Sequence, residues 1–207
     1  MKEKLQEQIA QGQSYQEFRT MVDELLTKDQ TTGTNHSEAY LNYTKLNVSR
    51  MQRLDKTLKL NDETNAVLSR QYTPMTWLIL VEAWCGDVAQ NMPVISKMAD
   101  LAPGIEIKMI LRDENLEIMD QFLTDGGRGV PKLIAIWNEN GQIAGTWGPR
   151  PEPAQNMVRA YKKLEEKPPY SEFVKDVQMW YNRDKNQTIQ AEFLTLIHSW
   201  EKSPAIS

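Results

Sequence analysis

The chain has 207 residues, of which 40% are hydrophobic and 25% are charged, and its formal net charge at pH 7 is −4. This length suits one well-cored domain with additions, and the ordinary globular composition argues against disorder. Binding to the phosphate backbone of nucleic acids requires a basic surface, so the acidic balance predicts no nucleic-acid partner.

The sequence predicts neither a targeting signal nor a membrane span. The N-terminal region has no apolar run of signal-peptide length, and no stretch approaches the ~18–20 apolar residues of a membrane-spanning helix. We therefore expect a cytoplasmic protein with no membrane partner. The only cysteine, Cys85, cannot form an intramolecular disulfide, which fits a reducing compartment and equally fits any protein without disulfides.

Helical spacing dominates the first part of the chain. Apolar residues three or four apart predict an amphipathic helix over residues 1–30, with a break near Gly12. Ser37 and Asn61 are suitable N-caps for two further helices. Residues 1–73 are therefore predicted to form a helical extension that packs on the core.

Continuous apolar runs then indicate buried strands. Residues 77–81 and 105–111 are such runs, and residues 88–101 between them have helical spacing. This order predicts a βαβ unit with parallel strands and a right-handed crossover. A short helix is expected over residues 115–123.

A hairpin and a helix are expected next. Strands over residues 131–137 and 142–147 flank an Asn-Gly pair, which is the strongest short hairpin signal. Pro153 suits the first turn of the helix that follows. Residues 74–167 are therefore predicted to form an α/β core with a central sheet.

Residues 168–207 are predicted to form a helical tail. This segment is too aromatic for a linker, and we expect it to pack on the core or on a partner chain. If Trp180 and Trp200 lie across the site at Cys85, the tail gates access to that site.

The stretch AWCGDV, residues 83–88, carries the first of several motifs that resemble the thioredoxin family. Trp84, Cys85 and Gly86 are similar to the start of the family's W-C-G-P-C site. Pro93 stands where thioredoxins carry a proline in the helix behind the active site.

Two later motifs extend the resemblance in the same order. Residues 127–133, GRGVPKL, look like the family's G-x-P-T-L stretch, whose proline is cis and faces the cysteine; here it is Pro131. Residues 140–145 with Gly148 are similar to the closing hairpin and its glycine. The resemblance covers residues 76–165, and it implies a thioredoxin-like α/β fold, with a central mixed sheet flanked by helices and with helical N-terminal and C-terminal extensions. The chain looks most like bacterial members with a W-C-G-D site.

Two departures from the family pattern change the expected chemistry. Val88 stands where the family has its resolving cysteine, and Ile79 stands where it has a buried acid implicated in proton transfer. Attack by Cys85 on a disulfide would therefore give a mixed disulfide that only an outside thiol can release. The C-G-D-V site also differs from the C-G-F-S site of iron–sulfur-binding monothiol glutaredoxins.

Cys85 is the candidate catalytic residue. A cysteine at a helix N-terminus gains thiolate character from the unpaired N–H groups and the positive end of the dipole. Asp87 opposes this effect by adding negative charge near the sulfur, so we expect only a modestly lowered pKa for the thiol. The Asp87 side chain itself is expected to be an exposed helix-start residue.

The resemblance also implies a substrate-binding set. In the family, the residue before the cis proline offers its backbone to an extended substrate chain, which assigns this role to Val130 and Pro131. Trp84 would form an apolar wall, while Gly86 and Asp87 would shape the helix start. The expected partner is a disulfide-containing protein or a low-molecular-weight thiol.

These candidate site residues suggest two alternative functions. The first is a thioredoxin-like monothiol protein, acting as a reductase or as a thiol-capture protein whose mixed disulfide persists. The alternative is a redox-inactive thioredoxin-fold protein that binds a peptide or protein, because a lone cysteine is often only a small buried hydrophobe. His36 and His198 have no ligand-like neighbours, so neither a metal site nor a cofactor is expected.

Overall fold

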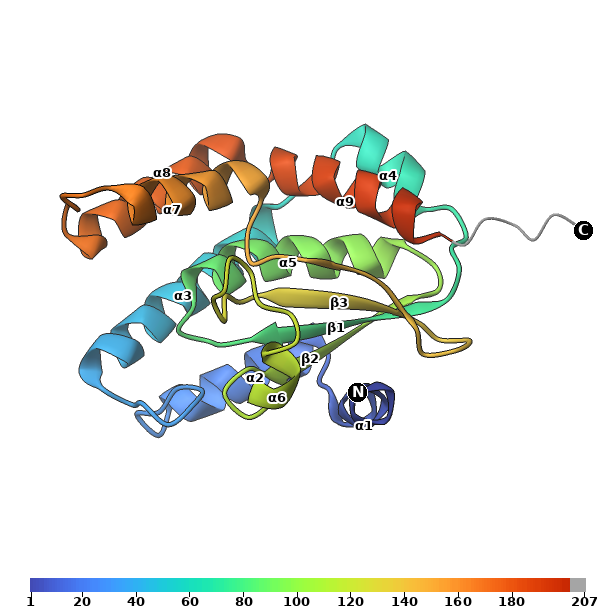
Figure 1. Cartoon of the computed structure of the whole chain (residues 1–207), viewed down its shortest axis with the longest axis horizontal. Helices are drawn as coiled ribbons and strands as arrows, with labels where there is room; N and C mark the ends of the chain where they lie inside the picture. Colours follow the sequence, from blue (N-terminus) through green and yellow to red (C-terminus); the bar gives the residue numbers. More distant parts are fainter. Residues whose placement is uncertain (202–207) are drawn as a thin grey trace, which may run out of the picture.

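The computed structural model describes residues 1–201, whose helices and strands follow one another as Figure 1 shows. The elements in chain order are α1 (Lys2–Gln11), α2 (Tyr15–Leu26), α3 (Glu38–Thr57), α4 (Asp62–Leu68), β1 (Met75–Val81), α5 (Gly86–Leu101), β2 (Ile105–Leu111), α6 (Leu116–Met119), β3 (Lys132–Trp137), β4 (Ile143–Trp147), α7 (Glu152–Lys163), α8 (Tyr170–Asp184) and α9 (Gln187–Trp200).

The four strands form one mixed sheet in the order β2-β1-β3-β4. β1 pairs with β2 in parallel and with β3 antiparallel, and β3 pairs antiparallel with β4. The parallel pair needs a crossover, which α5 provides. This arrangement confirms the predicted fold class, a central mixed sheet flanked by helices, with helical extensions at both ends.

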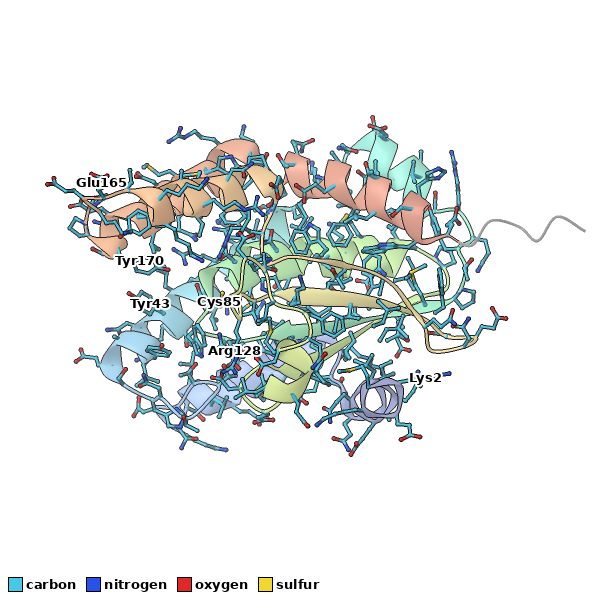
Figure 2. All side chains as sticks on the ribbon, in the orientation of Figure 1. Lys2, Tyr43, Cys85, Arg128, Glu165 and Tyr170 are labelled. Atoms are coloured by element: carbon cyan, nitrogen blue, oxygen red, sulfur yellow. The ribbon has the colours of Figure 1, made fainter. Side chains whose placement is uncertain are left out.

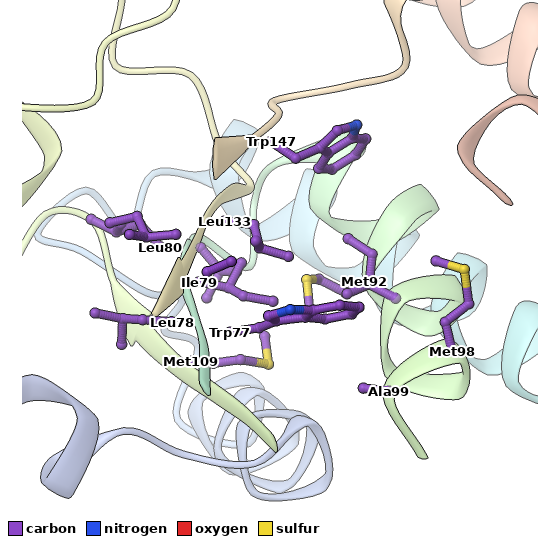
Figure 3. Packing of buried hydrophobic residues seen from close by; sticks show 14 of the residues in the cluster. Trp77, Leu78, Ile79, Leu80, Met92, Met98, Ala99, Met109, Leu133 and Trp147 are labelled. Carbon is purple, nitrogen blue, oxygen red and sulfur yellow. The ribbon is translucent and has the colours of Figure 1, made fainter. Parts of the chain in front are cut away.

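The centre of the hydrophobic core lies on β1, whose seven residues are all buried. Figure 3 shows Trp77 on the side of the sheet that faces Met92 of α5, with Leu78 and Leu80 on the opposite side. Burying each of these large apolar side chains contributes roughly 1.5–3 kcal/mol. The central strand is therefore covered on both faces, and its last residue leads directly into the segment that carries Cys85.

Helices cover both faces of the sheet. α5 and α9 lie on one side, and α2 and α6 lie on the other (Figure 1). α3 packs along α5, and α4 contacts both α5 and α9. α7 and α8 pack against each other around a smaller hydrophobic cluster formed by Phe173, Val177 and Tyr181. None of the helices in the described part of the chain is both long and apolar enough to span a bilayer.

The N-terminal segment differs from a single helix over residues 1–30. The chain leaves the helical path at Gly12, and the next residue, Gln13, exchanges two backbone hydrogen bonds with Met109 of β2, with N···O distances of 2.9 and 2.7 Å. The expected break near Gly12 is therefore an extra strand-like bridge at the edge of the sheet. It separates α1 from α2, which starts at a capping box formed by Ser14 and Glu17.

Two other expectations are refined by the structure. The short helix expected over residues 115–123 spans only Leu116–Met119. The predicted tail forms two helices, α8 and α9, and Phe193 and Trp200 of α9 belong to the main hydrophobic core. The tail thus packs on the core of its own chain, and the end of the predicted segment, residues 202–207, lies outside the described residues.

Candidate functional site

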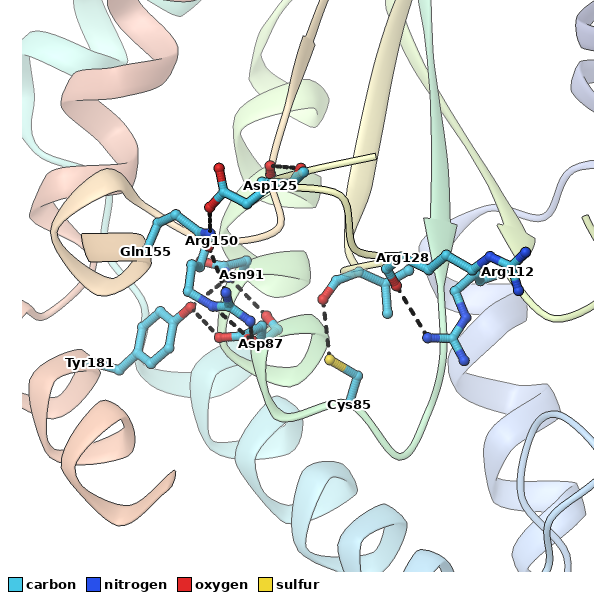
Figure 4. Close-up of polar contacts among 12 residues, drawn as sticks. Cys85, Asp87, Asn91, Arg112, Asp125, Arg128, Arg150, Gln155 and Tyr181 are labelled. Carbon is cyan, nitrogen blue, oxygen red and sulfur yellow. Dashed lines mark hydrogen bonds and ion pairs between the residues drawn. The ribbon is translucent and has the colours of Figure 1, made fainter. Parts of the chain in front are cut away.

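Cys85 lies between β1 and α5, where it is the N-cap residue of the helix. Its thiol donates a hydrogen bond to the backbone carbonyl oxygen of Val130, with Sγ and O 3.1 Å apart (Figure 4). The side chain is partly exposed. The two stretches AWCGDV and GRGVPKL therefore meet at the sulfur, as the resemblance to the thioredoxin family implies.

The pKa of the Cys85 thiol contradicts the modest lowering expected from the sequence. Burial and, to a smaller extent, the carboxylate of Asp87 raise this pKa to about 12. The backbone N–H groups at the start of α5 and the guanidinium of Arg150 act in the opposite direction but do not compensate. At neutral pH Cys85 is therefore a thiol, which agrees with its role as the donor in the hydrogen bond to Val130.

Two proline loops pack against each other beside the sulfur. The peptide bonds Val130–Pro131 and Gly148–Pro149 are both cis, and the second was not expected from the sequence. Gly148 has φ +108°, and a Cβ on it would lie 2.2 Å from the carbonyl oxygen of Pro131. A Cβ on Gly129 would lie 2.8 Å from Cγ of Pro149. Only glycine fits at both positions, and this close packing holds the carbonyl of Val130 opposite the thiol.

Asp87 is not the exposed helix-start residue that the sequence suggested. Its side chain is only 12% exposed, and its Oδ2 lies 2.6 Å from Nη2 of Arg150 in an ion pair. Its Oδ1 accepts a hydrogen bond of 2.8 Å from the phenol of Tyr181, whose oxygen also accepts one of 3.0 Å from Asn91. The expectation failed because the partners, Arg150 and Tyr181, are far from Asp87 in sequence and no local pattern indicates them.

The polar cluster around Asp87 continues away from Cys85. Nη1 of Arg150 donates to Oε1 of Gln155 at 2.6 Å, and Nε2 of Gln155 donates to Oδ2 of Asp125 at 2.7 Å (Figure 4). Arg150 thereby joins the N-terminus of α5 to the loop before β3. Burial and the neighbouring carboxylate of Asp87 both keep Tyr181 a neutral phenol, because each raises its pKa.

Trp84 forms the opposite side of the site. The guanidinium of Arg112 lies over its indole ring, 4.8 Å from the centroid, and the ring of Tyr40 lies 5.2 Å away. Nη1 of Arg112 also donates to the backbone carbonyl oxygen of Arg128, at 3.2 Å. These contacts hold the Trp84 ring next to the loop that carries Arg128, and neither Arg112 nor Tyr40 belongs to a motif that would have indicated them.

A buried acid near the site was also missed. Glu82 follows β1 directly and is fully buried, and its Oε1 accepts a hydrogen bond of 2.9 Å from the backbone N–H of Asp113. Burial raises the pKa of Glu82. The carboxyl group thus joins the ends of β1 and β2, next to Trp84.

The tail borders the site through α8. Gln178 accepts a hydrogen bond of 2.8 Å from Gln90, and a Cβ on Gly86, the first residue of α5, would lie 3.1 Å from its side chain. Trp200 packs instead against Trp77, at the end of the sheet away from Cys85.

Trp180 does not cover the sulfur either, since its ring packs on the neighbouring Tyr181. The gating by two tryptophans that the sequence left open is therefore absent among the described residues. Exposed aromatic side chains instead flank this end of the molecule, with Tyr43 on α3 and Tyr170 at the start of α8 (Figure 2).

The structure brings the predicted site residues Trp84, Cys85, Gly86 and Asp87 to the start of α5, beside the loop that contains Val130. Histidines take no part in this arrangement: Nδ1 of His36 accepts a hydrogen bond from the backbone N–H of Thr31, at 3.3 Å. Within residues 1–201, no group of three or more His, Cys, Asp or Glu side chains is arranged to hold a metal ion.

Comparison with known families gives one match to the sequence. A family model described as Thioredoxin matches residues 33–163, which include the whole sheet and the stretch around Cys85. No curated protein matches the chain.

Two solved structures resemble the fold. A protein of unknown function from Pseudomonas aeruginosa aligns over 92% of this chain and 94% of its own, with a TM-score of 0.59 and 16% sequence identity. An HIV epitope-scaffold protein aligns over 90% of this chain and 98% of its own, with a TM-score of 0.53 and 16% identity. At this level of identity, the likeness concerns the fold, and it includes the helical extensions.

Proposed function

Because the chain belongs to the thioredoxin family, we propose that it is a monothiol thiol-capture protein in which Cys85 forms a long-lived mixed disulfide with a docked partner. The hydrogen bond between the Cys85 thiol and the carbonyl of Val130 carries this proposal. It places the sulfur against the backbone group that, in the family, receives an extended substrate chain.

The proposed exchange proceeds in two steps. The thiolate of Cys85 attacks one sulfur of a partner disulfide, a Cys85–partner S–S bond forms, and the other partner sulfur leaves as a thiolate that takes up a proton. No second cysteine is present to displace the partner. Release then requires an outside thiol, whose thiolate attacks the partner sulfur and forms a new S–S bond with it. Cys85 leaves as a thiolate and takes up a proton.

The raised pKa favours capture over rapid turnover. Little thiolate is present at neutral pH when the thiol pKa is about 12, so attack on a free disulfide is slow. A thiol of high pKa is also a poor leaving group, so the mixed disulfide is slow to break at the Cys85 sulfur. Slow release lengthens the life of the adduct, whereas slow formation restricts capture to a partner that stays docked at the site. A reductase instead needs fast formation and fast release.

The same observation supports a second function, namely a redox-inactive thioredoxin-fold protein that binds a peptide or protein. In that case the Cys85–Val130 hydrogen bond would only stabilise the loop, and the partner would bind without a covalent bond. Trp84 and the backbone around Pro131 would still form the binding surface.

Glutathione disulfide at pH 7 to 10, with intact-mass detection, distinguishes the two functions. Capture predicts a single adduct on the folded protein, an adduct rate that rises with pH over the whole range, and its removal by added thiol. Cys85→Ser is the control and should form none. If the folded wild-type protein forms no adduct at any pH, while the urea-unfolded chain does, the thiol-capture function is wrong and the binding function remains.

A further inference from the structure

A cavity of about 590 Å3 lies beside Lys132 and Gly148, and Cys85 is not among the residues that line it. Its walls come from the loop at Leu123–Asp125, the edge strand β4, and the helices α7 and α9. The volume falls within the range typical of small-molecule sites. Arg150 lines this cavity and also pairs with Asp87, so the cavity and the Cys85 site share one wall.

Lys132 is the unusual group in this cavity. It directly follows Pro131 and is only 6% exposed. Its Nζ donates one hydrogen bond, of 3.1 Å, to Oγ1 of Thr124, which in turn donates to the carbonyl oxygen of Gly148. Among residues 1–201, no carboxylate lies within ion-pair distance of this amine. Two of its three N–H donors are therefore left to the cavity.

The other charged groups of the cavity are already engaged. Arg159 pairs with Asp125 at 2.8 Å and with Glu152 at 2.5 Å. Glu192 accepts hydrogen bonds from the indole N–H of Trp147, at 2.8 Å, and from the backbone N–H of residue 152, at 2.7 Å. Lys132 is thus the cation of this cavity whose charge no side chain of the described chain balances.

A buried ammonium group is costly unless it is paired, because burial removes the water that would otherwise solvate its charge. Burial accordingly lowers the pKa of Lys132. A carboxylate or phosphate group in the cavity would balance the charge of the Lys132 ammonium. Its oxygens would accept hydrogen bonds from the two remaining N–H groups. Thr146, which lines the same cavity and is exposed, would offer a hydroxyl group to the same ligand.

We propose that this cavity binds a small anionic ligand through a carboxylate or phosphate group that pairs with the ammonium of Lys132. The site is separate from the Cys85 thiol, and its occupation does not depend on whether Cys85 is reactive. A carboxylate and a phosphate would make the same contact with Lys132, and separate titrations with succinate and with inorganic phosphate distinguish them.

The test uses the full-length protein labelled on lysine, with the side-chain 13Cε resonance of Lys132 as the signal. Inorganic phosphate and succinate are titrated separately up to about 50 mM, which covers weak millimolar binding. We expect at least one of them to shift the Lys132 resonance saturably. We also expect the pKa of Lys132 to rise in its presence, because a bound anion favours the charged amine. A shift with phosphate alone or with succinate alone identifies the oxyanion.

Lys132→Met removes the charge and keeps an unbranched side chain, and it should weaken anion binding about tenfold or more. Because this variant lacks the Lys132 signal, its affinity and that of the wild-type protein are compared through the backbone amide resonances of Thr124 and Thr146, which line the cavity. Lys162→Met is the matched control, because Lys162 is exposed on α7 and does not line the cavity. It should leave the affinity within about twofold. The proposal is overturned if neither anion shifts the Lys132 resonance in the wild-type protein, a result that does not require the variant to fold. Equal anion affinity in the Lys132→Met and wild-type proteins would also overturn it.

Discussion

Nη2 of Arg150 lies 2.6 Å from Oδ2 of Asp87, so one ion pair places two opposite charges beside the thiol of Cys85. The two charges act on the same pKa in opposite directions, since the carboxylate disfavours the thiolate and the guanidinium favours it. The effect of each charge on the Cys85 pKa can therefore be measured separately, by substituting one partner of the ion pair at a time.

Asp87→Asn should lower the pKa of Cys85 and speed its alkylation by iodoacetamide between pH 7 and 9, whereas Arg150→Met should raise the pKa and slow alkylation. Both variants break a largely buried ion pair and should lose about 3 kcal/mol of stability. Loosened packing would change the Cys85 pKa in the same direction in both variants, because both lose stability. An electrostatic effect changes it in opposite directions, so the two causes can be told apart. A change of the Cys85 pKa in the same direction in both variants would contradict this explanation.

The raised pKa of Cys85 predicts a loss of stability at alkaline pH. The folded state keeps the thiol protonated up to about 12, whereas the unfolded chain loses the proton near the ordinary value of 9.0. The stabilisation is therefore complete below pH 9 and is lost as the pH rises toward 12, by up to about 1.4 kcal/mol per pH unit.

Urea unfolding at pH 8, 9 and 10 measures this effect against Cys85→Ala. The free energy of unfolding of the wild-type protein should fall more steeply with pH than that of the variant. Tyr181, whose pKa is also raised, contributes equally to both proteins and cancels in the difference. Parallel pH dependence in the two proteins would mean that the thiol pKa is not raised by folding.

Gly148→Ala should strongly destabilise the protein, because the new Cβ would lie 2.2 Å from the carbonyl oxygen of Pro131 and the residue has φ +108°. We expect a loss of about 3 kcal/mol or more. Gly126→Ala is the matched control, since Gly126 also has positive φ, +73°, but nothing lies within 4 Å of its added Cβ. It should cost about 1–2 kcal/mol from the backbone alone. If thermal or urea unfolding shows equal losses of stability in Gly148→Ala and Gly126→Ala, the close packing of the two proline loops is contradicted.

Tyr181→Phe tests how the tail is held to the site. The variant removes the hydroxyl that donates to Asp87 and accepts from Asn91, and it should cost about 1–3 kcal/mol and reduce amide-exchange protection in α8. Tyr161→Phe is the control, because its hydroxyl donates to the carbonyl oxygen of Pro168 in an exposed position. That variant should cost less than about 1 kcal/mol. A larger loss in Tyr161→Phe would show that the buried hydroxyl does not anchor α8.

Local patterns predict the elements that place Cys85. The continuous apolar run of β1 and the helical spacing of α5 are properties of neighbouring residues, and the structure has both elements close to their expected bounds. The approach of Val130 to the sulfur follows from the resemblance of two short motifs to one family, and the structure places the carbonyl of Val130 3.1 Å from Sγ.

Long-range contacts explain what could not be predicted. The burial of Asp87 depends on Arg150 and Tyr181, and the contact with Tyr181 joins residues 94 positions apart in sequence. The thiol pKa was expected in the wrong direction because the effect of a helix N-terminus can be read from local sequence, whereas the burial that outweighs it depends on how the whole chain packs. Lys132 likewise reads as an ordinary strand residue until the cavity beside it is known.

The distance in sequence between Asp87 and Tyr181 has a consequence during protein synthesis. A ribosome adds roughly 5–20 residues per second, so the 94 residues that separate the pair take about 5–20 seconds to make. During this interval the nascent chain already contains the cysteine, while the helix that borders it does not yet exist. The carboxylate of Asp87 therefore remains without its hydrogen bond from Tyr181 until translation is nearly complete.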